Sequence, residues 1–360
     1  MSVPDLLYDE TEEDLRQSLR ALLSTEDRLP AALARIDGGE PYDAKLWRVL
    51  TAEIGLAGLL VPEELGGDGA GPGVAALELE ELGRAVAPVP FLGSAVVATT
   101  ALLACGATDL VQRLASGDAV AALAVPFSTT PYDAVGRGGG LNGTITSVAD
   151  ALPADILLVP ADDGLWAVDA EAPGVTRTPV VSLDATRQLC DVTLDGASGE
   201  RIADADTGRA AVRAALTTGA ALLASEQLGV ASWCLETTVA YVKERYQFGR
   251  PVGSFQAVKH RLADLWVDVT QARAVARYAA ARAGEKDGEA EIAAALAQAH
   301  CGPVAVHAAE ECVQLHGGIG FTWEYPAHLY LKRAKASAIA FGTADRHRAA
   351  LGKLVGLTPA

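Results

Sequence analysis

The sequence YVKERYQFGRPVGSFQ, residues 241–256, lies between two long runs that are rich in Ala and Leu. It brings Arg245, Phe248 and Gln256 together within a few positions. An arginine presents a planar fork of donors to phosphate, an aromatic ring offers a stacking face, and a glutamine both donates and accepts hydrogen bonds. Two interpretations follow: an anion-binding clamp, or a plain helix that ends at Gly249 before the next element begins.

The flanking runs predict a bundle of helices in the last part of the chain. Apolar residues recur there at the three- and four-residue spacing of a packed helix. Four long helical patterns are present, at residues 210–246, 255–284, 289–315 and 327–341. Helices of this length with short connections favour an antiparallel four-helix bundle.

The first part of the chain also predicts helices, whereas the middle predicts strands. Helical patterns cover residues 10–26, 45–56, 74–86 and 94–116. The expected strands are 120–125, 156–159, 165–168, 175–181 and 189–194, with a hairpin turn at Asp162-Asp163-Gly164. The sequence therefore predicts a mainly α protein with a middle β domain. Its expected domains are residues 1–117, helical, residues 118–205, β, and residues 206–360, a four-helix bundle.

Bulk composition limits the classes of function. Half of the 360 residues are hydrophobic and the formal net charge is −17, so we expect no nucleic-acid and no membrane partner. The five cysteines are scattered without a CxxC pair and the six histidines show no metal-ligand spacing with them, which predicts reduced thiols and no metal site. The start lacks the features of a signal peptide, and no window is typical of a transmembrane helix. These features predict a cytoplasmic protein.

Three further strings accompany the opening stretch. Residues 56–67 are LAGLLVPEELGG, residues 80–84 are EELGR, and residues 314–322 are QLHGGIGFT. Together with Arg245, Phe248-Gly249 and Gln256, and in this order along nearly the whole chain, they resemble the acyl-CoA dehydrogenase family. The resemblance implies an N-terminal helical domain, a middle β domain, a C-terminal four-helix bundle and FAD as cofactor.

The resemblance also implies that one half of each FAD site comes from a neighbouring subunit. In the family, which forms tetramers, the arginine, the phenylalanine, the glutamine and the Gln-x-x-Gly-Gly segment hold the pyrophosphate and adenosine end of the neighbour's FAD. The residues expected to do so here are Arg245, Gln247, Phe248, Gln256, Gln314, Leu315, His316, Gly317 and Gly318. Glycines let backbone amides approach a ligand closely, although an ordinary turn between helices is the alternative for Gly317-Gly318.

The half that a chain supplies to its own FAD departs from the family pattern. The family has a Thr-Glu-Pro-x-Ala-Gly-Ser-Asp loop beside the flavin ring and the substrate, whereas residues 125–133 are VPFSTTPYD. The family also has a Trp-Ile-Thr or Trp-Ile-Ser strand behind the flavin ring. Residues 141–156 lack that motif, and we expect the strand to be deleted.

The catalytic base is also missing. Removal of the α proton of an acyl thioester needs a carboxylate, which most of the family place directly before a Gly-Thr pair. Phe341 occupies that position here, and the position used by a subset of the family falls near Gly219. Glu226 and Asp345 are the substitute candidates, with a structural role favoured for Glu226. Thr343 and Asp345 are expected to contact the flavin, although a solvated carboxylate is the alternative for Asp345.

This pattern resembles the shorter, base-lacking subunit of actinobacterial α2β2 acyl-CoA dehydrogenases, including the Phe-Gly at 341–342 and the run TWEYP at 322–326. The leading hypothesis is a subunit of an FAD-dependent acyl-CoA dehydrogenase that completes the FAD site of a larger, catalytic paralogue. The implied substrate is an acyl-CoA, with a steroid-derived thioester as a candidate, and the implied acceptor is an electron-transfer flavoprotein. Two alternatives stay open: a self-sufficient homotetramer with a displaced carboxylate base, and a non-enzymatic scaffold that lost its flavin.

Overall fold

The N-terminal part of the computed structural model is helical, as predicted. The structure describes residues 6–24, 28–133, 140–285 and 288–357. The helices are α1 (Glu10–Leu23), α2 (Arg28–Gly38), α3 (Ala44–Ile54), α4 (Gly71–Arg84), the π-helical η3 (Phe91–Ala98), α5 (Thr99–Cys105) and α6 (Thr108–Ala115), with short 3-10 turns η1 (Leu56–Gly58) and η2 (Glu63–Leu65). The expected continuous helix over 94–116 is wrong, because Gly106 adopts a left-handed backbone (φ 68°) and ends α5. The sequence pattern also missed α2.

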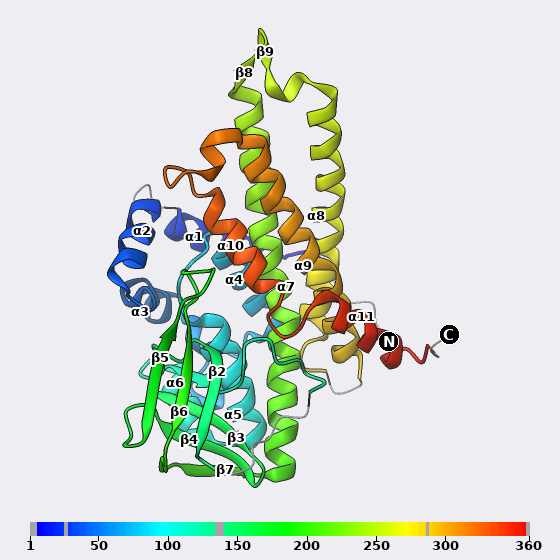
Figure 1. The fold of residues 1–360 in the computed structure, drawn as a ribbon. Helices are drawn as coiled ribbons and strands as arrows, with labels where there is room; N and C mark the ends of the chain where they lie inside the picture. The colour runs from blue at the N-terminus through cyan, green and yellow to red at the C-terminus, as the bar shows by residue number, and fades with distance from the viewer. Residues whose placement is uncertain (1–5, 25–27, 134–139, 286–287, 358–360) are drawn as a thin grey trace.

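The middle part forms two small sheets (Figure 1). One has the order β1-β3-β4-β7 and the other β2-β6-β5. The strands are β1 (Ala121–Leu123), β2 (Gly143–Ala149), β3 (Ile156–Ala161), β4 (Gly164–Asp169), β5 (Val175–Val180), β6 (Leu189–Leu194) and β7 (Glu200–Asp204). The predicted hairpin is confirmed, since Ala161 pairs with Gly164 at its turn. β2, at 143–149, was not among the expected strands, and β3 begins at Ile156 with no strand in the described residues 150–155.

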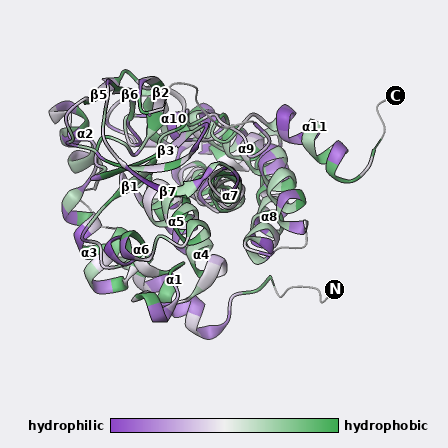
Figure 2. Cartoon of the chain, turned by 90° about the horizontal axis from the view of Figure 1, so that it is seen from below, coloured by the Kyte–Doolittle hydropathy of each residue, from purple (hydrophilic) through white to green (hydrophobic). Residues whose placement is uncertain are grey.

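The C-terminal part is built around α7 (Ala205–Glu244), whose middle is buried on all sides. Figure 2 shows α7 end on, with α4 and α5 on one side and α8 and α9 on another. The other elements are the β8 (Tyr246–Gln247) and β9 (Arg250–Pro251) hairpin, the 3-10 turn η4 (Val252–Ser254), α8 (Gln256–Arg282), α9 (Glu289–His316), the 3-10 turn η5 (Gly317–Phe321), α10 (Ala327–Ser337) and α11 (Ala344–Leu354). The four predicted helices are confirmed, and α11 is additional. Residues 289–321 are long and apolar enough to cross a membrane, but 67% of their most apolar window is buried in the protein, as in a core helix.

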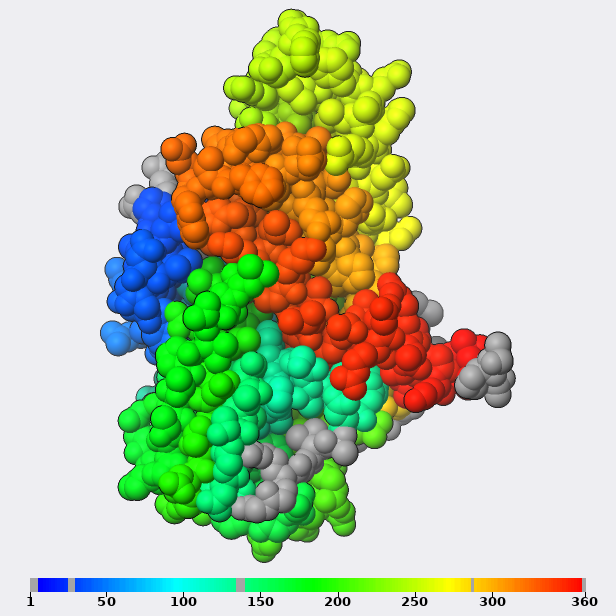
Figure 3. Space-filling view, viewed as in Figure 1, coloured from blue at the N-terminus to red at the C-terminus, as the bar shows by residue number. Residues whose placement is uncertain are grey.

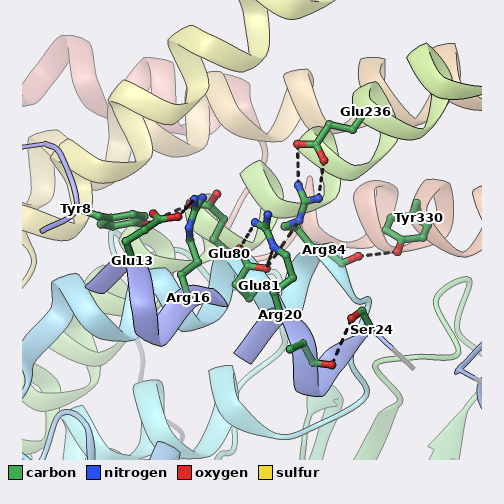
Figure 4. Close-up of polar contacts among 11 residues, drawn as sticks. Tyr8, Glu13, Arg16, Arg20, Ser24, Glu80, Glu81, Arg84, Glu236 and Tyr330 are labelled. Carbon is green, nitrogen blue, oxygen red and sulfur yellow. Dashed lines mark hydrogen bonds and ion pairs between the residues drawn. The ribbon is translucent and has the colours of Figure 1, made fainter. Parts of the chain in front are cut away.

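Charged residues on α4 connect the N-terminal segment to α4, and α4 to the bundle (Figure 4). Arg20 on α1 donates from Nε to Glu81 at 2.8 Å, and Arg84 donates to Glu236 on α7 at 3.0 Å. Tyr8 donates its hydroxyl to Glu80 at 3.2 Å. Glu78 is different, because its side chain is fully buried and neither carboxylate oxygen has a hydrogen-bond partner among the described residues.

Changing Glu78 to glutamine is expected to stabilise the protein increasingly as the pH rises. Burial, and secondarily the nearby Glu81 charge, raise the pKa of Glu78 to about 8. A raised pKa gives stability that is complete below the unfolded value near 4.5 and is lost as the pH rises through the folded value. We therefore expect nearly equal stability below about pH 4 and a gain of about 4 kcal/mol at pH 7.5. Urea unfolding across this pH range measures the difference in the free energy of unfolding between variant and wild type. Glu64→Gln, at an exposed position, is the control. A constant difference at every pH would contradict the prediction.

Candidate functional site

The stretch 241–256 forms the projecting tip of the molecule (Figure 3). α7 ends there, the backbone becomes extended at Arg245, and the β8–β9 hairpin follows. At the turn of the hairpin, Phe248 and Gly249 adopt left-handed backbone, with φ of 55° and 75°. Non-glycine residues rarely do so, and such strain is concentrated at functional sites. The outcome is a Phe248 side chain that is 92% exposed.

The polar side chains at this tip are not buried. Arg245, Gln247 and Gln256 are all exposed. Nearby, the Arg250 guanidinium lies 3.9 Å from the centre of the Phe255 ring, a cation–π contact that stabilises the base of the hairpin. The predicted side chains are therefore presented to solvent at one tip, from the end of α7, the hairpin and the start of α8.

The second predicted segment, 314–318, lies where α9 ends. Gln314, Gly317 and Gly318 are exposed. Gly317 has φ 63°, and a Cβ placed on either glycine would meet no atom within 4 Å. The Gly317 N–H donates to the Gln314 carbonyl, but no side chain covers the turn, so a ligand could approach its backbone closely.

His316 joins this turn to the helix that carries the hairpin. Its side chain is 2% exposed, and its ring lies between Tyr241 of α7, at 4.3 Å between ring centres, and Tyr325, at 4.5 Å. Its Nδ1 lies 2.7 Å from the carbonyl oxygen of Cys312. The stack connects the ends of α7 and α9, and Leu315 beside it is half-buried. A ligand contact at residue 316 would therefore come from the backbone.

Two predicted contacts lie elsewhere. Thr343 and Asp345 are exposed at the start of α11, which Figure 1 shows well below the hairpin. The Asp345 carboxylate accepts from Arg348 at 2.7 Å and is 92% exposed. A contact of these two residues with a cofactor stays a prediction.

Phe341 fills the place where a base would act. Its side chain is 4% exposed and packs edge-on against Phe127, with 5.6 Å between ring centres. Its backbone N–H donates to the Phe127 carbonyl at 2.8 Å. A Cβ added to Gly219 would lie 2.9 Å from the Phe341 ring and 2.8 Å from Val97. The two positions at which a base was expected, 341 and near 219, therefore lie close together, and an apolar ring occupies the space between them.

Little space is left around that ring. The cavity beside Phe341 measures about 30 Å³ and is lined mainly by apolar residues, among them Leu92, Val125 and Leu216. That volume corresponds to about one water molecule. Its polar wall is Asp150, at the end of β2, which accepts the Gly93 N–H at 3.1 Å and whose pKa is raised by burial. The pocket therefore offers mainly apolar surface, with one carboxylate and no guanidinium.

Glu226 belongs to a buried ionic network. Its side chain is 2% exposed and accepts both Nη atoms of Arg187, one of them at 3.0 Å, and the Ser337 hydroxyl at 3.1 Å. Arg333 lies 3.4 Å away and donates to Asp184 at 2.6 Å. Burial alone would raise the pKa of Glu226, but the two guanidinium groups lower it to about 2. A carboxylate held ionised in this way is a poor proton acceptor, so the structural interpretation of Glu226 is favoured.

The chain matches two family models. Residues 9–117 match the acyl-CoA dehydrogenase N-terminal domain, and residues 206–356 match the C-terminal domain. The acyl-CoA dehydrogenase IpdE2 of Mycolicibacterium smegmatis is 39% identical over 92% of this chain and 95% of its own length. IpdE2 of Mycobacterium tuberculosis is 38% identical over 91% of this chain and 92% of its own length.

Two solved structures have the same fold. A chain of the ChsE4–ChsE5 complex from Mycobacterium tuberculosis has a TM-score of 0.84 at 30% identity, over 99% of this chain and 100% of that one. A chain of a Tcur3481–Tcur3483 steroid ACAD variant has a TM-score of 0.82 at 34% identity, over 96% and 98%. With both terminal regions matched by the family models, the chain belongs to the acyl-CoA dehydrogenase family.

Proposed function

We propose that this chain is the non-catalytic subunit of a hetero-oligomeric, FAD-dependent acyl-CoA dehydrogenase. One observation carries the proposal: the residues expected to reach a neighbour's FAD are exposed, while the buried ring of Phe341 lies where a base was expected. The chain would therefore complete a site whose base and flavin ring lie in a larger paralogue, in an α2β2 assembly.

The two halves of the chain differ in how they fit FAD. The exposed hairpin and the exposed Gly317-Gly318 turn fit the diphosphate and adenosine end, because they offer a guanidinium, an aromatic face, side-chain amides and a backbone that no side chain covers. The residues proposed to hold it are Arg245, Gln247, Phe248, Gln256, Gln314 and the backbone of 315–318. The pocket beside Phe341 is lined mainly by apolar residues and offers no guanidinium and no side-chain amide. When bound, FAD supplies the hydride acceptor for α,β-desaturation, and the α proton goes to the partner's carboxylate.

Relatives support the pairing and suggest the substrate class. ChsE4–ChsE5 is a complex, and Tcur3481–Tcur3483 is a steroid ACAD. We extend the proposal to a steroid-derived acyl-CoA as substrate and to an electron-transfer flavoprotein as acceptor. We further propose a cytoplasmic location, supported by the free state of all five cysteines. The proposed domain limits, after residues 117 and 205, are supported by the extents of the two family models.

Co-expression with the larger paralogue tests the function. The chain alone is expected to purify colourless and inactive, whereas the pair is expected to purify yellow, with two FAD per α2β2 tetramer and acyl-CoA-dependent reduction of an electron acceptor. The absorbance of released FAD and the tetramer mass give the stoichiometry. A lone chain that is yellow and active would overturn the proposal, and an assembled but colourless pair would favour a scaffold.

Within that pair, Phe248→Ala is expected to weaken FAD retention by about fivefold or more, because aromatic stacking on a base contributes about 1–3 kcal/mol. Tetramer assembly should be unchanged, since the side chain is 92% exposed. FAD release during dialysis measures the effect. Exposed Tyr246→Ala, on the same hairpin, is the matched control. Equal FAD retention in both variants and the wild type would argue against a Phe248 contact.

A further inference from the structure

An exposed tryptophan follows the open turn, and two basic side chains lie against it. Trp323 is 59% exposed. The Nζ atom of Lys332 lies 4.5 Å from the centre of its ring system, and the His328 ring lies 4.5 Å away at 69°. Lys332 and His328 both belong to α10, one helical turn apart. We call these three residues the Trp323 platform.

The basic groups of the platform have no acidic partner. Among the described residues Lys332 makes no ion pair, although the chain carries a net charge of −17. Its neighbours on α10 do: Arg333 pairs with Asp184, and Lys335 with Glu310 at 2.6 Å. Within the same described ranges, neither ring nitrogen of His328 has a hydrogen-bond partner, and both are buried. An unpaired cation beside an exposed indole, on an acidic protein, suits a ligand that is both aromatic and anionic.

The platform lies next to the segment proposed to meet a cofactor. Tyr325, two residues after Trp323, packs on His316 at 4.5 Å, and His316 precedes the open Gly317-Gly318 turn. Figure 1 places the connection between α9 and α10 at the same end of the bundle as the β8–β9 hairpin. Phe321, between the turn and the platform, is 80% exposed. A ligand at this corner would therefore meet apolar surface and positive charge together.

We propose that the Trp323 platform binds an adenosine phosphate, with the base on the indole ring and a phosphate near Lys332. Adenine stacks on aromatic side chains, and an ammonium group binds phosphate as a point charge. Two molecules carry this chemistry: the 3′-phosphoadenosine end of coenzyme A and the adenosine diphosphate end of FAD. That coenzyme A or FAD is the natural ligand rests on the proposed function, whereas binding of the nucleotide itself to the platform does not.

Titration calorimetry of the full-length chain, alone and in the paired complex, tests the platform. The probes are 3′,5′-ADP for the coenzyme A source, 5′-ADP for the FAD source and adenosine as the uncharged reference. Trp323→Leu is expected to weaken nucleotide binding by at least fivefold, and Trp323→Phe to retain part of it. Lys332→Gln should weaken the two nucleotides about threefold or more, leave adenosine unchanged and reduce the salt dependence of binding.

Trp266→Leu is the matched control, because Trp266 is 60% exposed on α8 and should leave binding unchanged. Stronger binding of 3′,5′-ADP assigns the platform to coenzyme A, and stronger binding of 5′-ADP assigns it to FAD. The proposal is overturned if no probe binds in either state, or if Trp323→Leu, folded by its melting temperature, binds like the wild type. If the lone chain binds nucleotide but its complex with the paralogue is inactive, the proposed function is refuted and the proposal for the platform stands.

Discussion

Replacing Glu226 with glutamine is expected to lower the free energy of unfolding by about 3–5 kcal/mol, the typical cost of removing one partner from a buried ion pair. Arg187 and Arg333 would keep their charges with 5% and 1% of their side chains exposed. A neutral amide cannot balance either guanidinium. The loss of this carboxylate should also affect distant parts of the fold, because Glu226 joins Arg187, which precedes β6, to Arg333 on α10.

The matched control is Glu310→Gln. Glu310 is also ion-paired, with Lys335, but its side chain is 52% exposed, so we expect a change of about 0–1 kcal/mol. Urea unfolding of both variants gives the comparison. Turnover per folded site of the paired enzyme separates the two roles of Glu226. A structural residue leaves turnover unchanged, whereas a catalytic base would leave stability intact and abolish turnover. That second outcome would restore the displaced-base alternative.

The pH dependence has a defined sign. The folded pKa of Glu226, about 2, lies below the ordinary value of 4.5. A depressed pKa gives stability that is present above the unfolded value and is lost as the pH falls through the folded value. Wild type should therefore lose stability between about pH 4.5 and 2 more steeply than Glu226→Gln. Parallel acid-unfolding curves would contradict this assignment.

Local patterns predicted the elements that depend on neighbours in sequence. The hairpin at Asp162-Asp163-Gly164 was predictable because turn residues separate two apolar runs. The bundle helices were predictable because their periodicity extends over many turns. β2 was missed because its register shifts between Ile145 and Val148, so its alternation is broken. The exposed tip was located by its motif, although its projection depends on tertiary packing.

Long-range contacts were not predictable in the same way. Phe341 was identified as a missing base from its place before Gly342, but the sequence does not show that its ring covers Gly219. Glu226 meets Arg187, 39 residues away, and Arg333 meets Asp184, 149 residues away. The one feature of the sequence that pointed to this network was Arg333, an arginine within the apolar pattern of α10. It indicates a buried cation, but the acids that neutralise it are set by packing alone.

Gly229→Ala is expected to destabilise the chain by about 3 kcal/mol, at the upper end of the cost of overpacking. α4 and α7 cross so closely that a Cβ on Gly229 would lie 2.0 Å from the carbonyl oxygen of Glu80. A Cβ on Gly83, opposite, would lie 2.3 Å from the carbonyl oxygen of Glu226. Both obstructions are helix backbone, which cannot rotate away as a side chain can. The helices must separate, and apolar contacts along the crossing are lost.

The sign of this effect is the test, because glycine to alanine in a helix ordinarily stabilises by about 1 kcal/mol. Gly352, in α11, provides that reference, since a Cβ there would meet no atom within 4 Å. Gly352→Ala is expected to raise the melting temperature and Gly229→Ala to lower it. Two variants shifted in the same direction would mean that α4 and α7 do not approach this closely. Because α7 also carries the ionic network and, at its end, the exposed tip, Gly229→Ala should reduce FAD content of the paired enzyme only in proportion to the folded fraction.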